Sequence, residues 1–417
     1  MSRGWAAALV RFGRWGLLLA AVVAVAIGAS ASSPERATAR GGLEIGLQDD
    51  GVFLDHRYFS RTKALDRAKQ LKVTYIRVLA HWSWSIPFGK GSKKKKPPRV
   101  DYLFPRMDDL VDQAAKRGIR VELVLTGPAP AWAAANHRVG ADRTRATQFA
   151  EFARRAAIHF RGRVHRYSIW NEGNYKSWLQ PMSQSGTIYR KLYIAGYRAI
   201  KNVDPTAAVL IGETSPYALR GRAISPLSFL RQLACVSKSY KLSNGCVKKA
   251  PGPGGGPLLA DGYAHHPYDR HSPTYSYPGS DNVTIGTLGR LTSALDRLRK
   301  AGALTTPGGG SMPVFLTEFA YAAKGKTAVK ESTRAKYYKQ AFQIALKNPR
   351  VAQLCQYALV IPPRKNGGYP NATGIVALNN KPLPTFNALA SWAAKADGDG
   401  KIDAPGGPIT LQPRHYP

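Results

Sequence analysis

Short apolar segments alternate with amphipathic helical segments along most of the chain, and this alternation constrains the fold more than any other feature of the sequence. Short segments, most of them rich in Val, Ile and Leu, predict buried strands at residues 43–47, 73–79, 119–125, 165–170, 208–212, 261–265, 313–317 and 353–361. Helices are predicted at residues 61–71, 103–117, 144–160, 183–203, 226–235, 287–301, 331–347 and 383–394. Successive βα units with short buried strands predict a single-domain α/β fold, the (β/α)₈ TIM barrel.

Two glutamates lie where such a barrel places its functional residues, at the C-terminal ends of strands. Glu172 follows Trp170 and Asn171 at the end of the fourth strand, and Glu318 follows Thr317 at the end of the seventh. Each glutamate alone is equally explained as a neighbour of a helix cap or as a salt-bridge partner. Together they predict a pair that converges on one pocket, and paired carboxylates are the working groups of glycosidic-bond hydrolysis.

These residues resemble those of the clan A retaining glycoside hydrolases, the (β/α)₈ group that includes the family 5 cellulases and mannanases and the family 39 xylosidases. In that group an Asn-Glu pair after strand four supplies the general acid/base, and a Glu after strand seven is the nucleophile. The resemblance covers essentially the whole barrel. It implies Glu172 as acid/base and Glu318 as nucleophile in a double displacement on a poly- or oligosaccharide, with no metal or cofactor.

The same resemblance implies further substrate-site residues. Arg77, in the second strand, corresponds to the arginine beneath the nucleophile, although a lone strand arginine is equally explained as a structural ion pair. Asn171 is expected to hydrogen-bond the sugar 2-hydroxyl. His266 and Tyr268, after the sixth strand, resemble a His-x-Tyr motif whose tyrosine touches the nucleophile. His265 is the alternative inward-facing histidine, because neighbours on a strand point to opposite sides.

Aromatic side chains in the loops at the same barrel face are candidate platforms for sugar rings. The candidates are Trp82, Trp84, Trp132 and Trp178. Each alone is also explained as packing, and we expect one or two platforms. Glu213, which ends the fifth strand, is a third strand-end carboxylate and is expected to bind substrate or to support the pair. The eighth strand contains Tyr357 and no Trp, which departs from many members of the clan and leaves the sugar preference open.

The first residues predict an export signal, so that residues 1–31 are expected to be removed and the protein to be secreted. A basic start precedes an apolar run at residues 16–27, and Ala29-Ser30-Ala31 offers the small residues of a cleavage site. The apolar run is short for a membrane span, which needs about 20 residues, and an uncleaved signal anchor is the alternative. We expect the barrel at residues 40–395 and a flexible tail at residues 396–417.

The three cysteines fit an exported protein with few disulfides. Cys235 and Cys246 flank a Lys-rich, loop-like segment and are predicted to form a disulfide. Cys355 lies in an apolar strand and is predicted to be a buried thiol, because a catalytic cysteine needs a polar, electropositive setting.

The formal net charge of +36 indicates a surface that attracts polyanions, so we expect electrostatic association with an anionic cell envelope. Apart from Lys93-Lys94-Lys95-Lys96, the cations are spread along the chain without a nucleic-acid module, which argues against a specific nucleic-acid partner. The expected partner is a carbohydrate substrate, and the expected state is a monomer. The alternative function is a non-catalytic barrel that binds carbohydrate or envelope polyanions.

Overall fold

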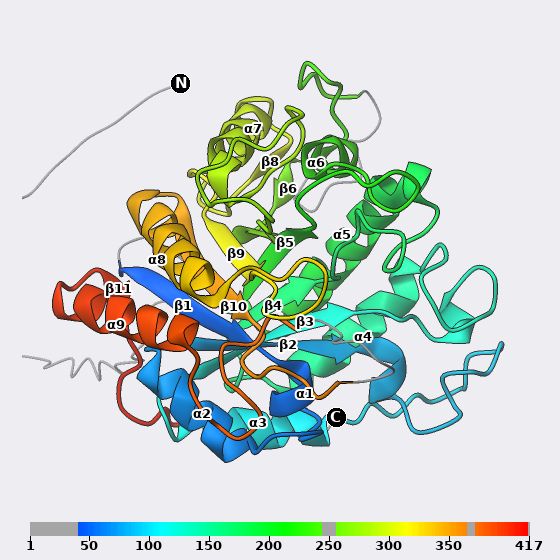
Figure 1. Cartoon of the computed structure of the whole chain (residues 1–417). Coiled ribbons are helices and arrows are strands. Elements are labelled where there is room, and N and C mark those ends of the chain that lie inside the picture. Colours follow the sequence, from blue (N-terminus) through cyan, green and yellow to red (C-terminus); the bar gives the residue numbers. More distant parts are fainter. Residues whose placement is uncertain (1–40, 244–255, 365–371, 416–417) are drawn as a thin grey trace, which may run out of the picture. The chain divides into compact units, whose positions relative to one another are not determined.

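The described part of the chain is a closed parallel barrel with helices outside it (Figure 1). The computed structural model describes residues 41–243, 256–364 and 372–415. Its barrel strands are β1 Leu43–Gln48, β2 Tyr75–His81, β3 Arg120–Thr126, β4 Arg166–Ile169, β5 Ala208–Thr214, β7 Gly262–His265, β9 Val314–Phe319 and β10 Val351–Tyr357. They pair in the order β10-β9-β7-β5-β4-β3-β2-β1, and β10 also pairs with β1. The predicted TIM barrel is therefore confirmed.

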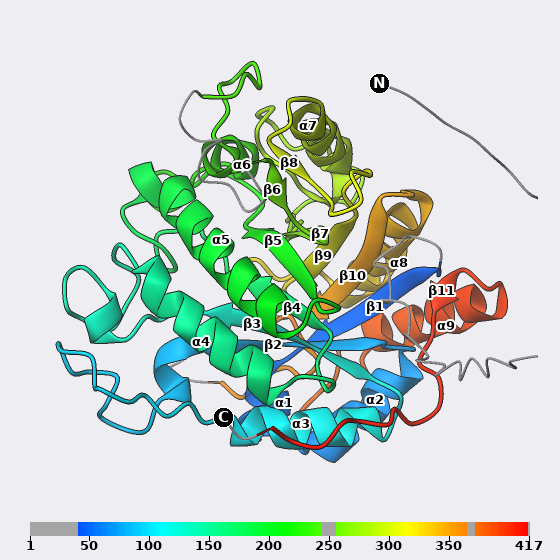
Figure 2. The same cartoon turned by 180° about the vertical axis from the view of Figure 1, so that it is seen from behind.

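Helices cover the outer side of these strands, as the reverse view shows (Figure 2). They are α2 Arg61–Gln70, α3 Pro105–Ala115, α4 Ala146–His159, α5 Ser185–Val203, α6 Pro226–Ala234, α7 Leu288–Lys300, α8 Glu331–Lys347 and α9 Pro384–Gly398. Shorter turns are α1 Asp50–Phe53, η1 Trp82–Ser85, η2 Ala131–Ala133, η3 Met182–Gln184 and η5 Ile285–Thr287. Proline begins α3, α6 and α9, where its missing N–H costs no helical hydrogen bond. In the described part of the chain, no helix is long and apolar enough to cross a membrane.

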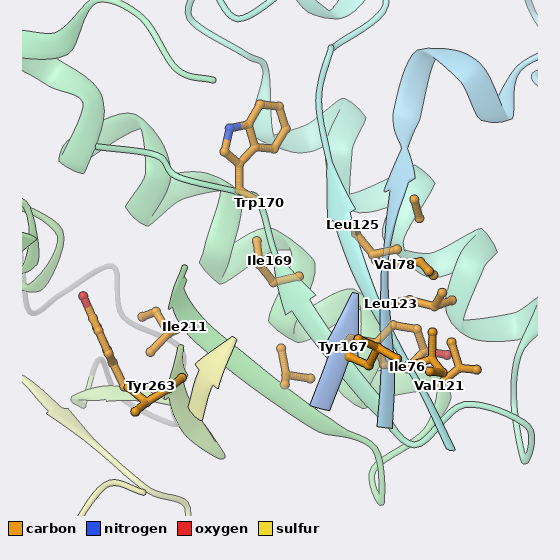
Figure 3. Packing of buried hydrophobic residues seen from close by; sticks show 14 of the residues in the cluster. Ile76, Val78, Val121, Leu123, Leu125, Tyr167, Ile169, Trp170, Ile211 and Tyr263 are labelled. Carbon is orange, nitrogen blue, oxygen red and sulfur yellow. The ribbon is translucent and has the colours of Figure 1, made fainter. Parts of the chain in front are cut away.

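Apolar strand residues and apolar helix residues form the main core between the two layers. Figure 3 shows Ile76 and Val78 of β2 among the buried apolar side chains. Leu110 of α3 and Phe149 of α4 belong to the same cluster. Burying each such side chain contributes about 1.5–3 kcal/mol. Because side chains alternate along a strand, Arg77 lies on the other side of β2 from Ile76 and Val78, toward the barrel interior.

The C-terminal tail, for which a flexible segment at residues 396–417 is predicted, contacts the barrel in its described part. Helix α9 continues to Gly398, and β11 Ile402–Asp403 pairs with β1. Beyond it, the Ile409 N–H donates to the Ala115 carbonyl. The glycines and prolines of the tail favour an irregular path, but its backbone groups still find partners on the barrel surface.

Two short strands and the cysteines add detail to the barrel. The two-residue strands β6 Leu258–Leu259 and β8 Leu304–Thr305 pair with each other and were too short to predict. Cys235 is disulfide-bonded, and Cys355 is a free, buried thiol as predicted. Cys246 and the expected export signal at residues 1–31 lie outside the described residues, so the pairing of Cys235 with Cys246 stays a prediction.

Charged groups fill the part of the barrel interior near the N-terminal ends of the strands. Arg166 donates to both carboxylate oxygens of Glu44, at 2.8 and 2.9 Å, and its guanidinium lies 3.7 Å from the centre of the Tyr75 ring. Glu122, which is fully buried, lies 3.8 Å from the same guanidinium. Arg166 therefore offsets part of the cost of placing two carboxylates in the barrel interior.

We expect Arg166→Met to lower the free energy of unfolding by about 3–5 kcal/mol, because it leaves Glu44 and Glu122 without their shared cation. Urea denaturation followed by circular dichroism measures the change. The control is Arg154→Met, which makes the same chemical change at an exposed position on α4 and should stay within about 0.5 kcal/mol of wild type. A loss below about 1 kcal/mol for Arg166→Met would show that the pair contributes little.

Candidate active site

The two predicted catalytic glutamates lie beside one histidine at the C-terminal end of the barrel. Glu172 Oε1 is 3.1 Å from His266 Nδ1, and Glu318 Oε2 is 3.7 Å from the same nitrogen. The two oxygens are therefore no more than about 7 Å from each other, a limit that includes the separation of about 5 to 5.5 Å found in retaining glycosidases. The structure thus brings together residues that lie far apart in the sequence.

Glu318 is held by two donors. Arg77 Nη1 donates to Oε1 at 2.8 Å, and the Tyr268 hydroxyl donates to Oε2 at 2.9 Å. Burial lowers the pKa of Arg77, but the carboxylates of Glu213, Glu318 and Glu122 outweigh it and raise that pKa, so the guanidinium stays charged. Burial, with Glu318 beside it, raises the pKa of Tyr268 far above its usual value, so the hydroxyl stays a donor. The Glu318 carboxyl group thus faces one cation and one hydroxyl donor.

Glu172 is positioned mainly by its backbone. Its N–H donates to the Glu213 carbonyl at 2.8 Å, and its φ of +38° lies in the left-handed region. Trp170 and Glu213 also have positive φ, at +65° and +47°. Such conformations cost non-glycine residues about 1–3 kcal/mol each and persist where the surrounding structure enforces them, often at functional sites.

Glu213 is a buried carboxylate that holds the site together, which favours the expected supporting role over the expected role in substrate binding. Its Oε2 accepts from Arg77 Nη2 at 2.9 Å, from His266 Nε2 at 2.7 Å and from Thr317 Oγ1 at 2.7 Å. Burial alone would raise its pKa, but Arg77 and His266 lower that pKa to about 2. Because Glu213 is fully buried, its carboxylate contacts Arg77, His266 and Thr317 and does not face a substrate.

The two adjacent histidines have opposite roles. Burial lowers the pKa of His266, but Glu318, Glu172 and Glu213 outweigh it and raise that pKa to about 10, so the ring is an imidazolium. His265 instead contacts Thr214 Oγ1 at 2.9 Å and the Val283 carbonyl at 3.0 Å. Burial lowers the pKa of His265 to about 3. The prediction of His265 as a substrate-binding residue is therefore wrong, and His266 is the inward-facing histidine.

Two predicted tryptophan platforms belong to the core. Trp82 and Trp132 are buried and meet edge to face, and Trp82 stacks on Phe152 with the rings 9° from parallel. They are unavailable to a sugar, so the prediction is wrong for both. The short turn η1 directs Trp82 inward and leaves Trp84 66% exposed. Trp178 is partly buried and lies nearly parallel to the His81 ring, 6.2 Å away.

Asn171 and Tyr357 also lie at this end of the barrel. The Asn171 side-chain oxygen accepts from Arg77 Nη2 at 2.9 Å, so its amide N–H groups remain to bind a hydroxyl. Tyr357, which ends β10, meets the Tyr268 ring edge-on at 6.4 Å between centres. An aromatic ring therefore stands at the end of the eighth strand even though no Trp is present.

A pocket lined by tyrosines, which the sequence did not predict, lies beside Glu172. The pocket has a volume of about 250 Å³, and its lining includes Glu172, Tyr175, Tyr217, Tyr268 and Tyr321. The available signal was the recurrence of tyrosine a few residues after the ends of β4, β5, β7 and β9. Tyrosine offers an apolar face and a polar tip, which suits a sugar ring as tryptophan does.

Solved structures of clan A glycoside hydrolases share this fold. The chain aligns with a family 39 glycoside hydrolase from Bacteroides cellulosilyticus at a TM-score of 0.61 and 19% identity, covering 85% of this chain and 64% of that one. It aligns with a monomeric β-xylosidase from Caulobacter crescentus at a TM-score of 0.54 and 17% identity, covering 84% of this chain and 67% of that one. It also aligns with a GH5_18 protein from Streptomyces cattleya, in complex with GlcNAc, at a TM-score of 0.54 and 16% identity, covering 88% of this chain and 82% of that one.

At these identities the likeness establishes the shared barrel fold, which is that of the clan the sequence resembles. The chain spans 64% of the length of the family 39 structure, so that protein contains parts with no counterpart here. No family model and no curated protein matches the sequence.

We expect His266 to stay protonated at pH 8 while His265 stays neutral, and Glu213→Gln to lower the pKa of His266 by removing one of its three carboxylate neighbours. Nitrogen-15 NMR of the imidazole rings over pH 5–10 measures both histidines in one sample. His265, which burial keeps neutral, is the internal control for folding. A His266 that titrates near 6.5 in the wild-type protein would contradict the assigned charge.

Proposed function

We propose that the protein is a retaining β-glycoside hydrolase that cleaves O-glycosidic bonds of an oligo- or polysaccharide. The observation that carries the proposal is the convergence of Glu172 and Glu318 on His266, with Glu318 fixed by Arg77 and Tyr268. The fold shared with glycoside hydrolases of families 39 and 5 supports it. Paired carboxylates at this position of a barrel are suited to the two-step chemistry of retention.

In the first step, the Glu318 carboxylate attacks the anomeric carbon and the bond to the leaving oxygen breaks. Glu172 gives its proton to that oxygen, and the leaving group departs as a neutral alcohol. In the second step, Glu172 takes a proton from water, whose oxygen attacks the same carbon. The ester to Glu318 then breaks, and both carboxyl groups return to their starting forms. Inversion at each step gives net retention.

The surrounding groups favour this division of roles. Arg77 and Tyr268 stabilise the anion of Glu318, as a nucleophile requires. Glu172 lines the pocket and has 18% of its side chain exposed, so a leaving group and later a water molecule have access to it. The amide N–H groups of Asn171 are oriented by Arg77 and would donate to a sugar hydroxyl.

We also propose that the enzyme acts outside the cytoplasm as a monomer, after cleavage of residues 1–31. The basic and apolar start of the sequence supports export, and the disulfide at Cys235 fits an oxidising compartment. The alternative, a barrel that only binds carbohydrate or polyanions, would have no need for two carboxylates placed beside one imidazolium. Its surface charge alone would account for polyanion binding.

We expect Glu318→Ala to lose glycosidase activity on an aryl β-glycoside that wild type hydrolyses, because the nucleophile is gone. Azide should restore turnover with an inverted product, since the anion attacks from the side that the carboxylate occupied. Chromatography and NMR of the glycosyl azide give the rate and the anomeric configuration. Glu151→Ala removes a carboxylate from α4, outside the site, and should keep wild-type activity.

We expect Glu172→Ala to slow the hydrolysis of substrates with poor leaving groups by about 10²–10⁴-fold, because their oxygen needs the proton. Dinitrophenyl glycosides, which depart without protonation, should be affected least, and azide should give a retained product. Steady-state kinetics over a series of aryl leaving groups measures the difference. Wild-type rates for both Glu318→Ala and Glu172→Ala on a confirmed substrate would show that the two glutamates are structural.

A further inference from the structure

The tyrosine-lined pocket lies on the acid/base side of the catalytic pair. Glu172 and Tyr268 line it together with residues from the loops after β4, β5, β7 and β9, whereas Glu318 and Asn171 are not among its described lining residues. In the proposed function, Glu172 protonates the leaving oxygen. The pocket beyond Glu172 is therefore the place for the leaving group, and the present inference rests on that proposed function.

The walls of this pocket are fixed by contacts behind them. Tyr217 stacks on Tyr277, with ring centres 4.8 Å apart and planes 7° from parallel. The Tyr321 hydroxyl donates to the His271 carbonyl at 2.8 Å. With a volume of about 250 Å³, the pocket is smaller than most drug-sized ligand sites, and it suits a single sugar ring packed against aromatic faces.

The four loops around the pocket carry exposed cations. These cations are Lys176, Arg220, Arg222, Arg270, Lys324 and Lys326. Apart from Glu172, the carboxylates in these loops are Asp269 and Asp281. Asp269 is 4% exposed and accepts from the backbone and the ring of His271, while Asp281 pairs with Arg231 of α6. Asp269 lines the pocket itself, with its Oδ1 bound by His271, whereas Asp281 is engaged by Arg231. The two carboxylates are outnumbered by the six loop cations, so the pocket surroundings keep an excess of positive charge.

Cations elsewhere on the barrel are more often balanced by a neighbour. Arg61 pairs with Asp109, Arg163 with Asp112, and Arg350 with Asp296, all on the helical layer or the opposite end of the strands. In contrast, none of the described ion pairs involves a cation of the four pocket loops. The loops therefore concentrate unpaired positive charge at the mouth of the pocket.

Arg270 is the cation that lines the pocket itself. It lies beside Tyr217, where its charge opposes the rise that burial causes in the pKa of that hydroxyl. A guanidinium presents two parallel N–H donors, which match the two oxygens of a carboxylate or a sulfate. An anion held there would lie beside the tyrosine faces that hold the sugar ring.

We infer that this pocket binds a leaving group whose sugar carries an anionic substituent, a carboxylate or a sulfate, so that the substrate is an acidic glycan. Arg270 binds the anion directly. The cations of the surrounding loops raise the local concentration of the substrate and speed its association.

The test compares monosaccharides that differ in one anionic group. Glucuronate is compared with glucose, galacturonate with galactose, and glucose 6-sulfate with glucose, with binding measured by ligand-observed NMR at physiological salt. We expect wild type to bind at least one acidic sugar about tenfold or more tightly than its neutral partner, as a charge-assisted hydrogen bond provides. The uronates and the sulfate ester distinguish the two sources of the anion.

Arg270→Gln should remove this preference, because it keeps the size of the site but loses the cation. The matched control is Arg154→Gln, which removes the same charge from an exposed position on α4 and should keep the preference. Both positions are exposed, so unchanged melting temperatures are expected and can be checked. The same loss in both variants, or equal binding of acidic and neutral sugars by wild type, would overturn the inference and make the charge a diffuse surface property.

The binding measurement is independent of turnover. Selective binding that depends on Arg270, without hydrolysis of any glycoside, would contradict the proposed function and support the preference of the pocket for an anion. Hydrolysis of neutral glycosides without any preference for an acidic leaving group would support the proposed function and contradict the inference about the pocket.

Discussion

The buried guanidinium of Arg77 is the group on which the site depends. It is 1% exposed, and it donates to Gln48, Glu318, Asn171 and Glu213. These acceptors come from β1, from β9, from the loop after β4 and from β5. Leaving these donors unpaired in the interior would cost several kcal/mol, so burial of this guanidinium requires that the strand ends converge on it and supply acceptors. The same requirement places Glu318, the proposed nucleophile.

The charges around Arg77 also give the carboxyl groups of the site different surroundings. Glu213 accepts from Arg77 and His266, and Glu318 accepts from Arg77 and Tyr268. Glu122 also lies 3.9 Å from Arg77 Nε, whereas Glu172 contacts His266. Glu172 makes the fewest contacts and is more exposed than Glu318, which makes it the group suited to act as acid.

The sequence predicted the barrel and the catalytic pair because both leave periodic traces. Apolar residues recur on the outer side of strands such as β2, and a carboxylate that ends a strand has only one face of the barrel to occupy. The orientation of single side chains produces no periodic pattern in the sequence and could not be predicted from it. The turn η1 decides that Trp82 is buried and Trp84 exposed, and only the packing around Glu213 shows that this carboxylate faces partners and not substrate.

The two members of the pair are held by different physical means. The Glu172 N–H binds the Glu213 carbonyl, and both residues adopt left-handed backbone conformations, so the proposed acid/base is placed by the main chain. Glu318 lies on a regular strand, and its carboxylate is placed by the side chains of Arg77 and Tyr268. Changes among those side chains therefore act first on Glu318. Glu213 is the link between the two, since its backbone holds Glu172 while its carboxylate holds Arg77 and His266.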